Sequence, residues 1–192
     1  MVEHPRLEYE KDYFVNGAYR EYKDYDNHGP RVERLIRLTN NPKSVLDVGC
    51  AYGFIVGRLV TKGIDAYGSD VSKWCQQQAE KIIPGRFALA PAHQLPFPDK
   101  RFDVLYCEGV LEHIEEYYIY LVFQEFQRVA RQRVLVLTFD CARTRGHLCN
   151  HSIEWWFDKI PNDTYLYSGD NDSSGPAPWW YKNKQGVKEI VR

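Results

Sequence analysis

The spacing of hydrophobic and polar residues predicts helices that alternate with short strands along most of the chain. Stretches in which apolar residues recur every three or four positions are separated by short continuous runs of apolar and β-branched residues. The predicted helices are 31–38, 54–62, 72–82, 118–130 and 152–160. The predicted strands are 44–48, 65–69, 86–89, 102–107, 133–139, 164–168 and 187–191.

The order of these elements predicts an α/β domain. Strands that alternate with helices of about 10–15 residues form βαβ units with right-handed crossovers, so we expect a mostly parallel, Rossmann-like sheet with helices on both faces. The last predicted strand, Val187–Val191, is expected to run antiparallel to the others at a sheet edge. With 192 residues the chain is long enough for one domain with a full core.

Composition and charge narrow the functional classes. The formal net charge is −1, from 25 Lys and Arg against 26 Asp and Glu, so we expect no basic surface and no nucleic-acid partner. Apolar runs fall well short of the roughly 20 residues of a membrane span, and Met1–Glu10 is too polar for a signal peptide, so no membrane association is expected. The five cysteines are an odd number, which argues against a disulfide framework and for a reduced, cytoplasmic setting.

Aromatic residues are concentrated at the two ends of the chain. Half of the 28 aromatics fall within 1–25 and 151–192, although these segments make up about a third of the sequence. The two ends are therefore expected to have a role that the middle does not have.

A glycine-rich turn follows the first predicted strand. Gly49 and Gly53 permit a tight turn and a close approach of a ligand to the backbone. Asp70 follows the second predicted strand, 21 residues after Gly49, where a carboxylate can accept hydrogen bonds from both hydroxyls of a ribose. A glycine-rich turn with an acid at this distance indicates a nucleoside ligand.

The residues of this turn distinguish between nucleoside ligands. Asp47 lies two residues before Gly49, where its charge would repel a pyrophosphate but suits a ligand with an ammonium group. The G-x-G-x-x-G spacing of dinucleotide folds is missing, and no Gly-Lys-Ser/Thr of a P-loop follows. S-adenosylmethionine has a ribose and a cationic amino-acid end and no phosphate, so it fits better than a nicotinamide dinucleotide.

Three ordered motifs resemble those of the class I S-adenosylmethionine-dependent methyltransferases. Val45–Phe54 is similar to their motif I, and Asp70 matches their ribose-binding acid. Leu95–Val104 resembles the stretch that leads into their fourth strand, and Val110–Ile114 matches the V-L-E-H-I that opens the next helix. The resemblance, from Ser44 to Asp140, implies the class I methyltransferase fold and S-adenosylmethionine as cofactor.

The resemblance also implies a set of cofactor-binding residues. They lie in the turn, after the second strand, in the third motif and after the fourth strand, and they are Asp47, Gly49, Cys50, Ala51, Gly53, Asp70, Val71, Ala92, His93 and Glu108. Two departures bear on this set. Pro91 replaces the acid that usually reaches the adenine amino group, so Ala92 is expected to offer its backbone N–H and His93 or Gln94 a polar contact. Arg131-Gln132 replaces the usual Gly-Gly turn before the fifth strand.

Candidate catalytic groups follow the fourth predicted strand. His113 is the best candidate for a general base, and the alternative is a helix residue hydrogen-bonded to a neighbouring loop. Glu108 is either a ligand contact or a solvated loop acid, and Tyr106 is expected to pack in the core.

The segment Cys141–His151 contains two cysteines and two histidines, but its spacing fits no standard zinc module. We therefore expect no metal there and predict that it borders the substrate site, with His147 or His151 meeting the substrate.

The aromatic ends complete the predicted organisation of one methyltransferase domain. Residues 1–30 are interpreted either as an amphipathic helix that packs on the sheet or as a lid over the cofactor, with Tyr19 facing the sulfonium. Residues 31–140 form the cofactor core and 141–192 the substrate side. The predicted acceptor is an oxygen or nitrogen of a small molecule, and the chain is expected to be a monomer or homodimer. The alternatives are a non-catalytic S-adenosylmethionine-binding module, and a methyltransferase of a protein or RNA that a partner recognises.

Overall fold

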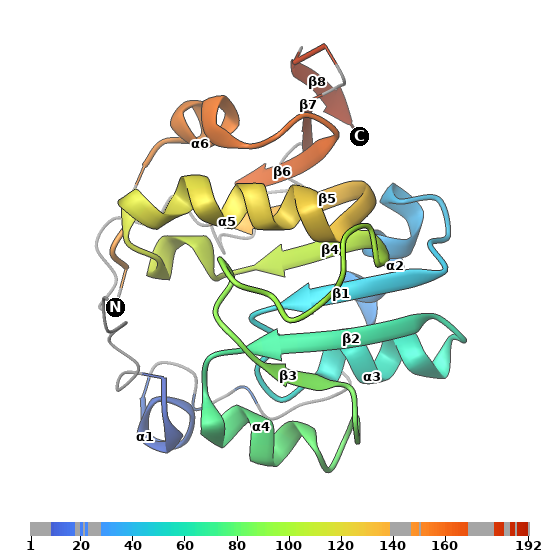
Figure 1. Ribbon diagram of the computed structural model, residues 1–192, viewed down its shortest axis with the longest axis vertical. Helices are drawn as coiled ribbons and strands as arrows, with labels where there is room; N and C mark the ends of the chain where they lie inside the picture. Colours follow the sequence, from blue (N-terminus) through green and yellow to red (C-terminus); the bar gives the residue numbers. More distant parts are fainter. Residues whose placement is uncertain are drawn as a thin grey trace. The chain divides into compact units, whose positions relative to one another are not determined.

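The computed structural model describes residues 9–17, 20, 22, 28–138, 147–149, 151–168, 179–182, 185–186 and 188–191 (Figure 1). The chain forms two compact units, Met1–Ala92 and His93–Arg192. None of the helices within the described ranges combines the length and apolarity that a bilayer crossing needs.

The first unit is built on three parallel strands. β1 (Ser44–Val48) pairs with β2 (Asp65–Asp70), which pairs in turn with β3 (Phe87–Leu89). Every residue of β1 is buried, as expected for a central strand of a parallel sheet. The carboxyl ends of β1 and β2 lie in register, with Val48 opposite Ser69. This register brings the turn after β1 next to the residues that follow β2.

Four helices belong to this unit. They are α1 (Lys11–Val15), α2 (Gly29–Leu38), α3 (Phe54–Thr61) and α4 (Lys73–Ala79). α3 connects β1 to β2 and lies behind them in the view of Figure 1. Its buried side chains include Ile55, Val56 and Leu59, which supply the apolar face that covers the sheet.

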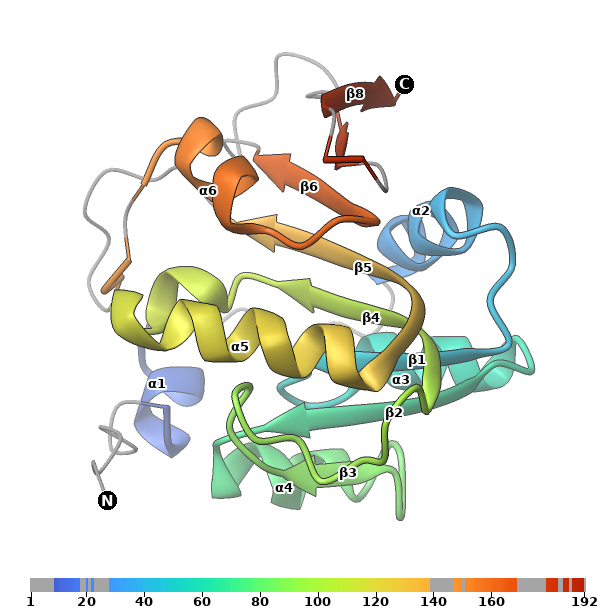
Figure 2. The same cartoon turned by 45° about the horizontal axis from the view of Figure 1, so that its top comes forward.

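The second unit is built on β4 (Phe102–Glu108), β5 (Ala130–Thr138) and β6 (Thr164–Ser168), which pair in parallel. β7 (Trp179–Lys182) runs antiparallel to β6, and β8 (Lys188–Val191) runs antiparallel to β7. Figure 2 shows β4, β5 and β6 side by side.

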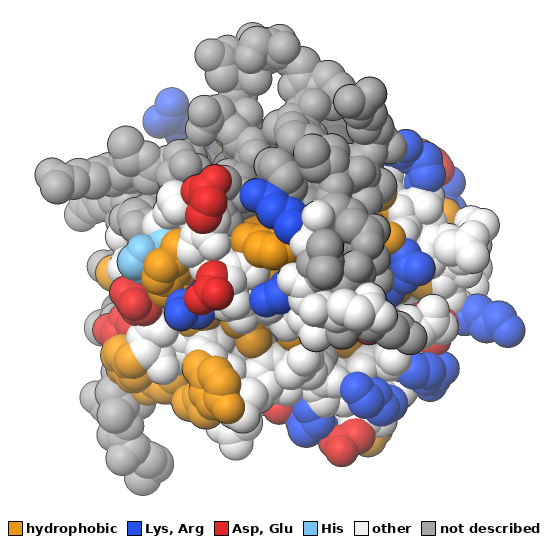
Figure 3. Space-filling model, turned by 90° about the horizontal axis from the view of Figure 1, so that it is seen from above, with side chains coloured by type: hydrophobic (Ala, Val, Ile, Leu, Met, Phe, Trp, Pro, Cys, Tyr) orange, Lys and Arg blue, Asp and Glu red, His pale blue; other side chains and the backbone are white. Residues whose placement is uncertain are grey.

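The helices of this unit follow the parallel strands. After β4 comes a short 3-10 turn, η2 (Leu111–His113), then α5 (Glu116–Val129), and α6 (Ile153–Lys159) precedes β6. α5 lies in front of β4 and β5 in both ribbon views (Figures 1 and 2). Hydrophobic side chains also gather on the outer surface over α5 (Figure 3), where Tyr117, Tyr120 and Leu121 are exposed.

The mostly parallel sheet with helices is confirmed, and the predicted strands are found within one residue of their expected bounds, except that β5 begins three residues earlier than predicted, at Ala130. β7 was not predicted. Phe139, the predicted end of the fifth strand, lies outside the described residues. The prediction of an antiparallel last strand is not confirmed. β7 is the reversed strand, and two successive antiparallel pairings return β8 to the direction of β6.

Two helix bounds also differ from prediction. α4 begins after Ser72 as predicted, because the Ser72 hydroxyl accepts a hydrogen bond from the Cys75 N–H at 3.1 Å. It ends at Ala79 rather than at Ile82, since the N–H of Ile82 bonds the carbonyl of Ala79 three residues back and tightens the last turn. His113, which the resemblance to the V-L-E-H-I motif placed at the opening of the next helix, lies instead in η2, before α5 begins.

Candidate functional site

The turn after β1 depends on backbone conformations that favour glycine. Gly49 and Gly53 have φ values of 78° and 77°, and Ala51 between them has a φ of 46°. A Cβ on Gly53 would lie 2.5 Å from Cδ1 of Ile83, so a side chain there would collide as well as strain the backbone. The turn is thereby held tight against the first turn of α3.

Asp70 is the anchor of this turn. One carboxylate oxygen, Oδ2, accepts a hydrogen bond from the Ala51 N–H at 3.0 Å, and the other, Oδ1, accepts one from the Ser72 N–H at 2.9 Å. Burial raises the pKa of Asp70, and the hydrogen bonds from Ser72 and Ala51 oppose that rise because they favour the charged form. Val71 also donates a backbone hydrogen bond to this carboxylate, which has about four lone-pair sites in all. The carboxylate can therefore hold the turn and still accept hydrogen bonds from a ligand.

Asp47 and Cys50 lie close to this anchor. Asp47 is almost fully buried near the end of β1, and Cys50 is buried in the turn. Burial raises the pKa of the Cys50 thiol well above its ordinary value, and the nearby charges of Asp47 and Asp70 raise it further. The thiol is therefore neutral and unreactive, and the two carboxylates give the turn a negative potential that suits a cationic ligand.

Aromatic residues from the N-terminal segment pack directly on the turn. Phe14 is buried against Ala51, and its ring lies 5.4 Å from that of Tyr52. Tyr22 stacks on Phe54, the first residue of α3, at 5.3 Å. These contacts cover the outer side of the glycine-rich turn with large apolar surfaces that exclude water.

Glu10 ties the same segment to α4. Its carboxylate accepts hydrogen bonds from the N–H groups of Lys73 and Trp74 at 3.3 and 3.2 Å, which are free donors in the first turn of a helix. The Trp74 indole N–H donates to the hydroxyl of Tyr52 at 3.2 Å and links α4 back to the turn. Tyr19, predicted to face the sulfonium, lies outside the described residues.

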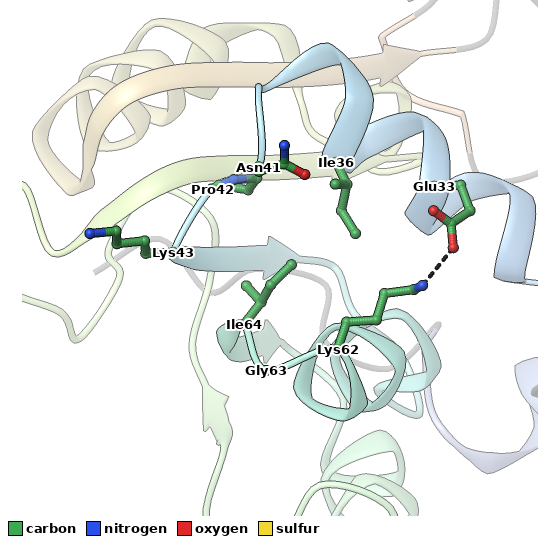
Figure 4. Close-up of a pocket in the computed structure, with 8 residues that line it drawn as sticks. All are labelled: Glu33, Ile36, Asn41, Pro42, Lys43, Lys62, Gly63 and Ile64. Carbon is green, nitrogen blue, oxygen red and sulfur yellow. Dashed lines mark ion pairs between the residues drawn. The ribbon is translucent and has the colours of Figure 1, made fainter.

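A separate pocket of about 760 Å³ lies at the opposite ends of the strands in the first unit, away from the glycine-rich turn (Figure 4). It is lined at the amino ends of β1 and β2 by residues such as Lys43 and Ile64. Lys62 forms an ion pair with Glu33 at 2.6 Å beside it. Ligands of open parallel sheets bind at the carboxyl ends of the strands, so this pocket is distinct from the predicted cofactor site.

In the second unit, the predicted residues at the end of β4 interact with one another. Tyr106 is buried as predicted, and its hydroxyl donates a hydrogen bond to the carboxylate of Glu108. The contact fixes Glu108 at the carboxyl end of the strand. His93 stacks on Tyr118 of α5, with ring centroids 4.8 Å apart. Ala92, the last residue of the first unit, is buried.

His113 and His147 meet, although 34 positions separate them in the sequence. Their rings pack edge to face with centroids 4.7 Å apart. The segment that carries His147 is fixed to η2 because the carbonyl of Glu112 accepts hydrogen bonds from the N–H groups of Leu148 and Cys149. The predicted base and one of the predicted substrate histidines thus share one site.

His151 lies in a different environment. Its Nε2 is 3.0 Å from a carboxylate oxygen of Glu116, at the start of α5, and its ring stacks on Trp155 at 3.8 Å. Cys149 between the two histidines is buried. Burial and the charges of Glu116 and Glu112 raise its pKa to about 12.

The structure thus groups the predicted residues in two places. Those of the turn and Asp70 lie together in the first unit, and Glu108, His113, His147 and His151 follow the strands of the second unit. Sequence reasoning missed Glu10, Glu112 and Glu116. Glu112 stands in the quoted V-L-E-H-I motif, which was the one signal for it. Of the segment Cys141–His151, residues 141–146 and 150 lie outside the described residues.

The first unit has parallel strands, a glycine-rich turn after β1 and the acid Asp70 at the end of β2. This combination is typical of α/β domains that bind nucleoside ligands. Comparisons with known proteins identify the family. The family model described as a methyltransferase domain matches residues 46–138. Demethylmenaquinone methyltransferase from Thermotoga maritima is 29% identical over 148 residues, which are 73% of this chain and 62% of the relative.

Two further proteins are similar to the chain. The tRNA U34 carboxymethyltransferase from Nautilia profundicola is 31% identical over 108 residues, 53% of this chain and 34% of that protein. The crystal structure of a SAM dependent methyltransferase from Archaeoglobus fulgidus superposes with a TM-score of 0.55 at 18% identity, over 64% of this chain and 56% of that one, and so shares its fold. The chain covers less than two thirds of both curated relatives. Residues 46–138 thus carry a methyltransferase domain, and the chain is similar to class I S-adenosylmethionine-dependent methyltransferases.

Proposed function

We propose that the protein transfers the methyl group of S-adenosylmethionine to an oxygen or nitrogen atom of a small molecule. The observation that carries the proposal is the position of Asp70, whose carboxylate is held between the amides of Ala51 and Ser72 at the carboxyl ends of β1 and β2. In this position a carboxylate binds the two hydroxyls of a ribose, as in other nucleoside sites at this edge of a parallel sheet.

The residues present fit S-adenosylmethionine. The buried Asp47 and Asp70 favour a cation, and the turn offers no cradle of lysine and free amides for a phosphate, since the N–H groups of Gly49 and Cys50 both donate to the carbonyl of Ser69. When bound, the cofactor supplies an electrophilic methyl group on a sulfonium. Phe14 and Tyr22, which cover the turn, would exclude water from it.

Residues of the second unit support the proposed role toward the methyl acceptor. His113, beside His147, would hold the proton that an acceptor hydroxyl or amine loses, and Glu108 would position the acceptor or the cofactor. The quinone methyltransferase relative acts on a small molecule by its name, whereas the tRNA enzyme does not. The near-neutral charge favours the small molecule, because RNA recognition depends on clustered basic residues.

We propose the domain organisation in the same terms. Residues 1–30 act as an aromatic lid, 31–140 as the cofactor core and 141–192 as the substrate side of one methyltransferase domain. The packing of Phe14 on the glycine-rich turn and the hydrogen bonds from α4 to Glu10 support the lid. The lid would retain the cofactor until transfer is complete.

Calorimetry with S-adenosylhomocysteine, S-adenosylmethionine and NAD tests the cofactor. We expect both sulfur ligands to bind and NAD not to bind. Asp70→Ala should weaken the sulfur ligands at least about 10-fold, since a carboxylate that accepts two hydrogen bonds contributes about 1.5–3 kcal/mol. The matched control is Asp65→Ala, at the other end of β2, where the aspartate pairs with Arg86. Binding of NAD alone, or equal affinities in Asp70→Ala and the wild type, would refute the proposal.

Methyl-labelled S-adenosylmethionine tests the acceptor class. The full chain is incubated with the label and with a cell extract split into small molecules, RNA and protein. We expect label in the small-molecule fraction, and His113→Gln should lower the rate of transfer while leaving S-adenosylhomocysteine affinity unchanged. Label in RNA or protein would overturn the acceptor assignment, and binding without transfer to any fraction would favour the non-catalytic module.

A further inference from the structure

The second unit contains a group of three side chains with the chemistry of metal ligands. Glu112 and His113 lie in η2, and His147 comes from the segment after β5. Each offers one ligand atom, a carboxylate oxygen or an imidazole nitrogen, and these three atoms all lie within 4.8 Å of one another. Glu112 is only 1% exposed, and the two histidines are half-buried.

The backbone holds the three side chains in place. The carbonyl of Glu112 accepts the N–H groups of Leu148 and Cys149 at 2.7 and 3.0 Å, which fixes the residue after His147 directly onto η2. The turn itself is closed by a hydrogen bond from the His113 N–H to the carbonyl of Val110 at 2.9 Å. The site is therefore set by main-chain bonds and not only by flexible side chains.

We infer that Glu112, His113 and His147 form a binding site for one divalent transition-metal ion of the Zn²⁺ class. Imidazole and carboxylate groups suit zinc, cobalt, iron and nickel, whereas Mg²⁺ and Ca²⁺ prefer oxygen ligands alone. A divalent ion is attracted to a buried carboxylate such as that of Glu112, because the opposite charges compensate each other. Edge-to-face packing of the two imidazoles leaves their nitrogens able to converge on one point.

The geometry requires only a small adjustment. Tetrahedral zinc with bonds of about 2.0–2.2 Å places its ligand atoms about 3.3–3.6 Å apart. The three ligand atoms lie within 4.8 Å of one another, so the side chains would have to move closer together around a bound ion. Three protein ligands leave a fourth position open, as in catalytic rather than structural zinc sites.

The location suggests that the open coordination position binds the methyl acceptor. This step rests on the proposed function. η2 follows the carboxyl end of β4, and the segment of His147 follows β5, so the site lies at the edge where parallel sheets bind ligands. An acceptor hydroxyl bound there would lose its proton to solvent at a lower pH, so with the ion in place His113 would hold the metal and would not take up the proton itself. Its oxygen would form the bond to the methyl carbon as the carbon–sulfur bond breaks, which leaves a methyl ether and neutral S-adenosylhomocysteine.

The inference differs from the expectation of no metal in Cys141–His151. That expectation weighed ligands within one segment. In the structure, the ligand set takes only His147 from this segment and the other two residues from η2. Sequence spacing alone contains no signal for a pairing of this kind.

Metal binding can be measured without any activity. The full chain, purified without a histidine tag and stripped with a chelator, is titrated with Co²⁺ while its visible absorption is recorded. We expect one Co²⁺ per chain, displaced by one equivalent of Zn²⁺. His147→Gln and His113→Gln should each weaken Co²⁺ binding at least about 100-fold, more than the loss of an outer-shell partner does. Glu112→Gln should do the same where circular dichroism shows that the variant is folded.

His93→Gln and His151→Gln serve as matched controls, because these histidines contact Tyr118 and Trp155 instead of the cluster. Both should bind Co²⁺ like the wild type. Absence of stoichiometric binding, or equal affinity in His147→Gln and the wild type, would overturn the inference. S-adenosylhomocysteine affinity, measured on the same samples, separates the two proposals. Metal binding without nucleoside binding would refute the proposed function and leave the metal site standing.

Discussion

The carboxylate of Asp70 accepts a hydrogen bond from the backbone N–H of Ala51 at 3.0 Å, across 19 positions of sequence. Ala51 has a positive φ of 46°, an uncommon conformation for a residue with a side chain. The hydrogen bond compensates for part of that strain. The residue that is proposed to bind the ribose thus also shapes the turn against which the cofactor would lie.

This dual role predicts a pH-dependent stability. Burial raises the pKa of Asp70 in the fold, so the folded state disfavours its charged form. The stability linked to this group is fully present below the pKa of the unfolded chain and is lost as pH rises through the raised folded pKa. The free energy of unfolding of the wild type should therefore increase relative to that of Asp70→Asn as pH falls from 7 through the folded pKa.

Urea unfolding of the two proteins at several pH values checks this prediction. Comparison with Asp70→Asn removes the contribution of every other carboxylate, since these groups are shared. The raised pKa would be contradicted if the free energy of unfolding of the wild type, relative to that of Asp70→Asn, stayed constant or decreased as pH falls.

Substitutions of Gly53 and Gly63 by alanine test how tightly the glycine-rich turn is packed. Both have positive φ values, 77° and 80°, but a Cβ on Gly53 would collide with Ile83, whereas a Cβ on Gly63 meets open space. Gly63→Ala should cost about 1 kcal/mol from backbone strain alone, and Gly53→Ala about 2–4 kcal/mol because overpacking is added. Denaturant unfolding measures both. Equal losses would show that Ile83 moves aside without cost.

Phe14 tests the aromatic N-terminal segment. Its ring is 5% exposed and packs on Ala51 and Tyr52, so Phe14→Ala should destabilise the protein by about 3 kcal/mol. If the segment is a lid, S-adenosylhomocysteine affinity should fall as well. Tyr120→Ala is the control, since this ring is 70% exposed on α5 and its removal should change stability by less than about 0.5 kcal/mol. Unchanged nucleoside affinity in a folded Phe14→Ala protein would leave packing as the segment's only role.

Local patterns in the sequence account for the parts of the fold that were predicted correctly. Ser72 begins α4 because a hydroxyl at that position bonds the Cys75 amide, and such a cap depends on three residues of spacing. The glycine-rich turn and Asp70 were found for a similar reason, since the length of one βαβ unit sets the distance between them.

The missed features depend on contacts between distant segments. The carboxylate of Glu10 accepts a hydrogen bond from the amide of Trp74, 64 positions away. Glu112 lies close to His147 because of the path of the segment after β5, and no sequence pattern predicted that path. The strand β7 was not predicted at all, and its reversed direction was missed for the same reason. Strand direction at a sheet edge follows from the connection, and 169–178 carries turn residues but no pattern that fixes where the chain leads.

Arg131 and Gln132, which were expected in a turn before the fifth strand, lie within β5 and predict a further effect on stability. The buried carboxylate of Asp103 accepts hydrogen bonds from Arg131 at 3.0 Å and from Gln132 at 3.2 Å, beside the register shift between β4 and β5. Arg131→Ala should cost no more than about 1 kcal/mol, because Gln132 still donates to the carboxylate.

The double variant Arg131→Ala/Gln132→Ala should cost about 2–4 kcal/mol, more than the sum of the single variants, because it leaves a buried carboxylate with neither donor. Asp99→Ala is the control. It removes an ion pair with Arg128 in which the aspartate side chain is 74% exposed, so it should cost less than about 1 kcal/mol. A double-mutant cycle by urea unfolding measures the coupling. Additive effects of the two substitutions would show that Asp103 does not depend on this pair, and that these two side chains have no part in holding β4 to β5.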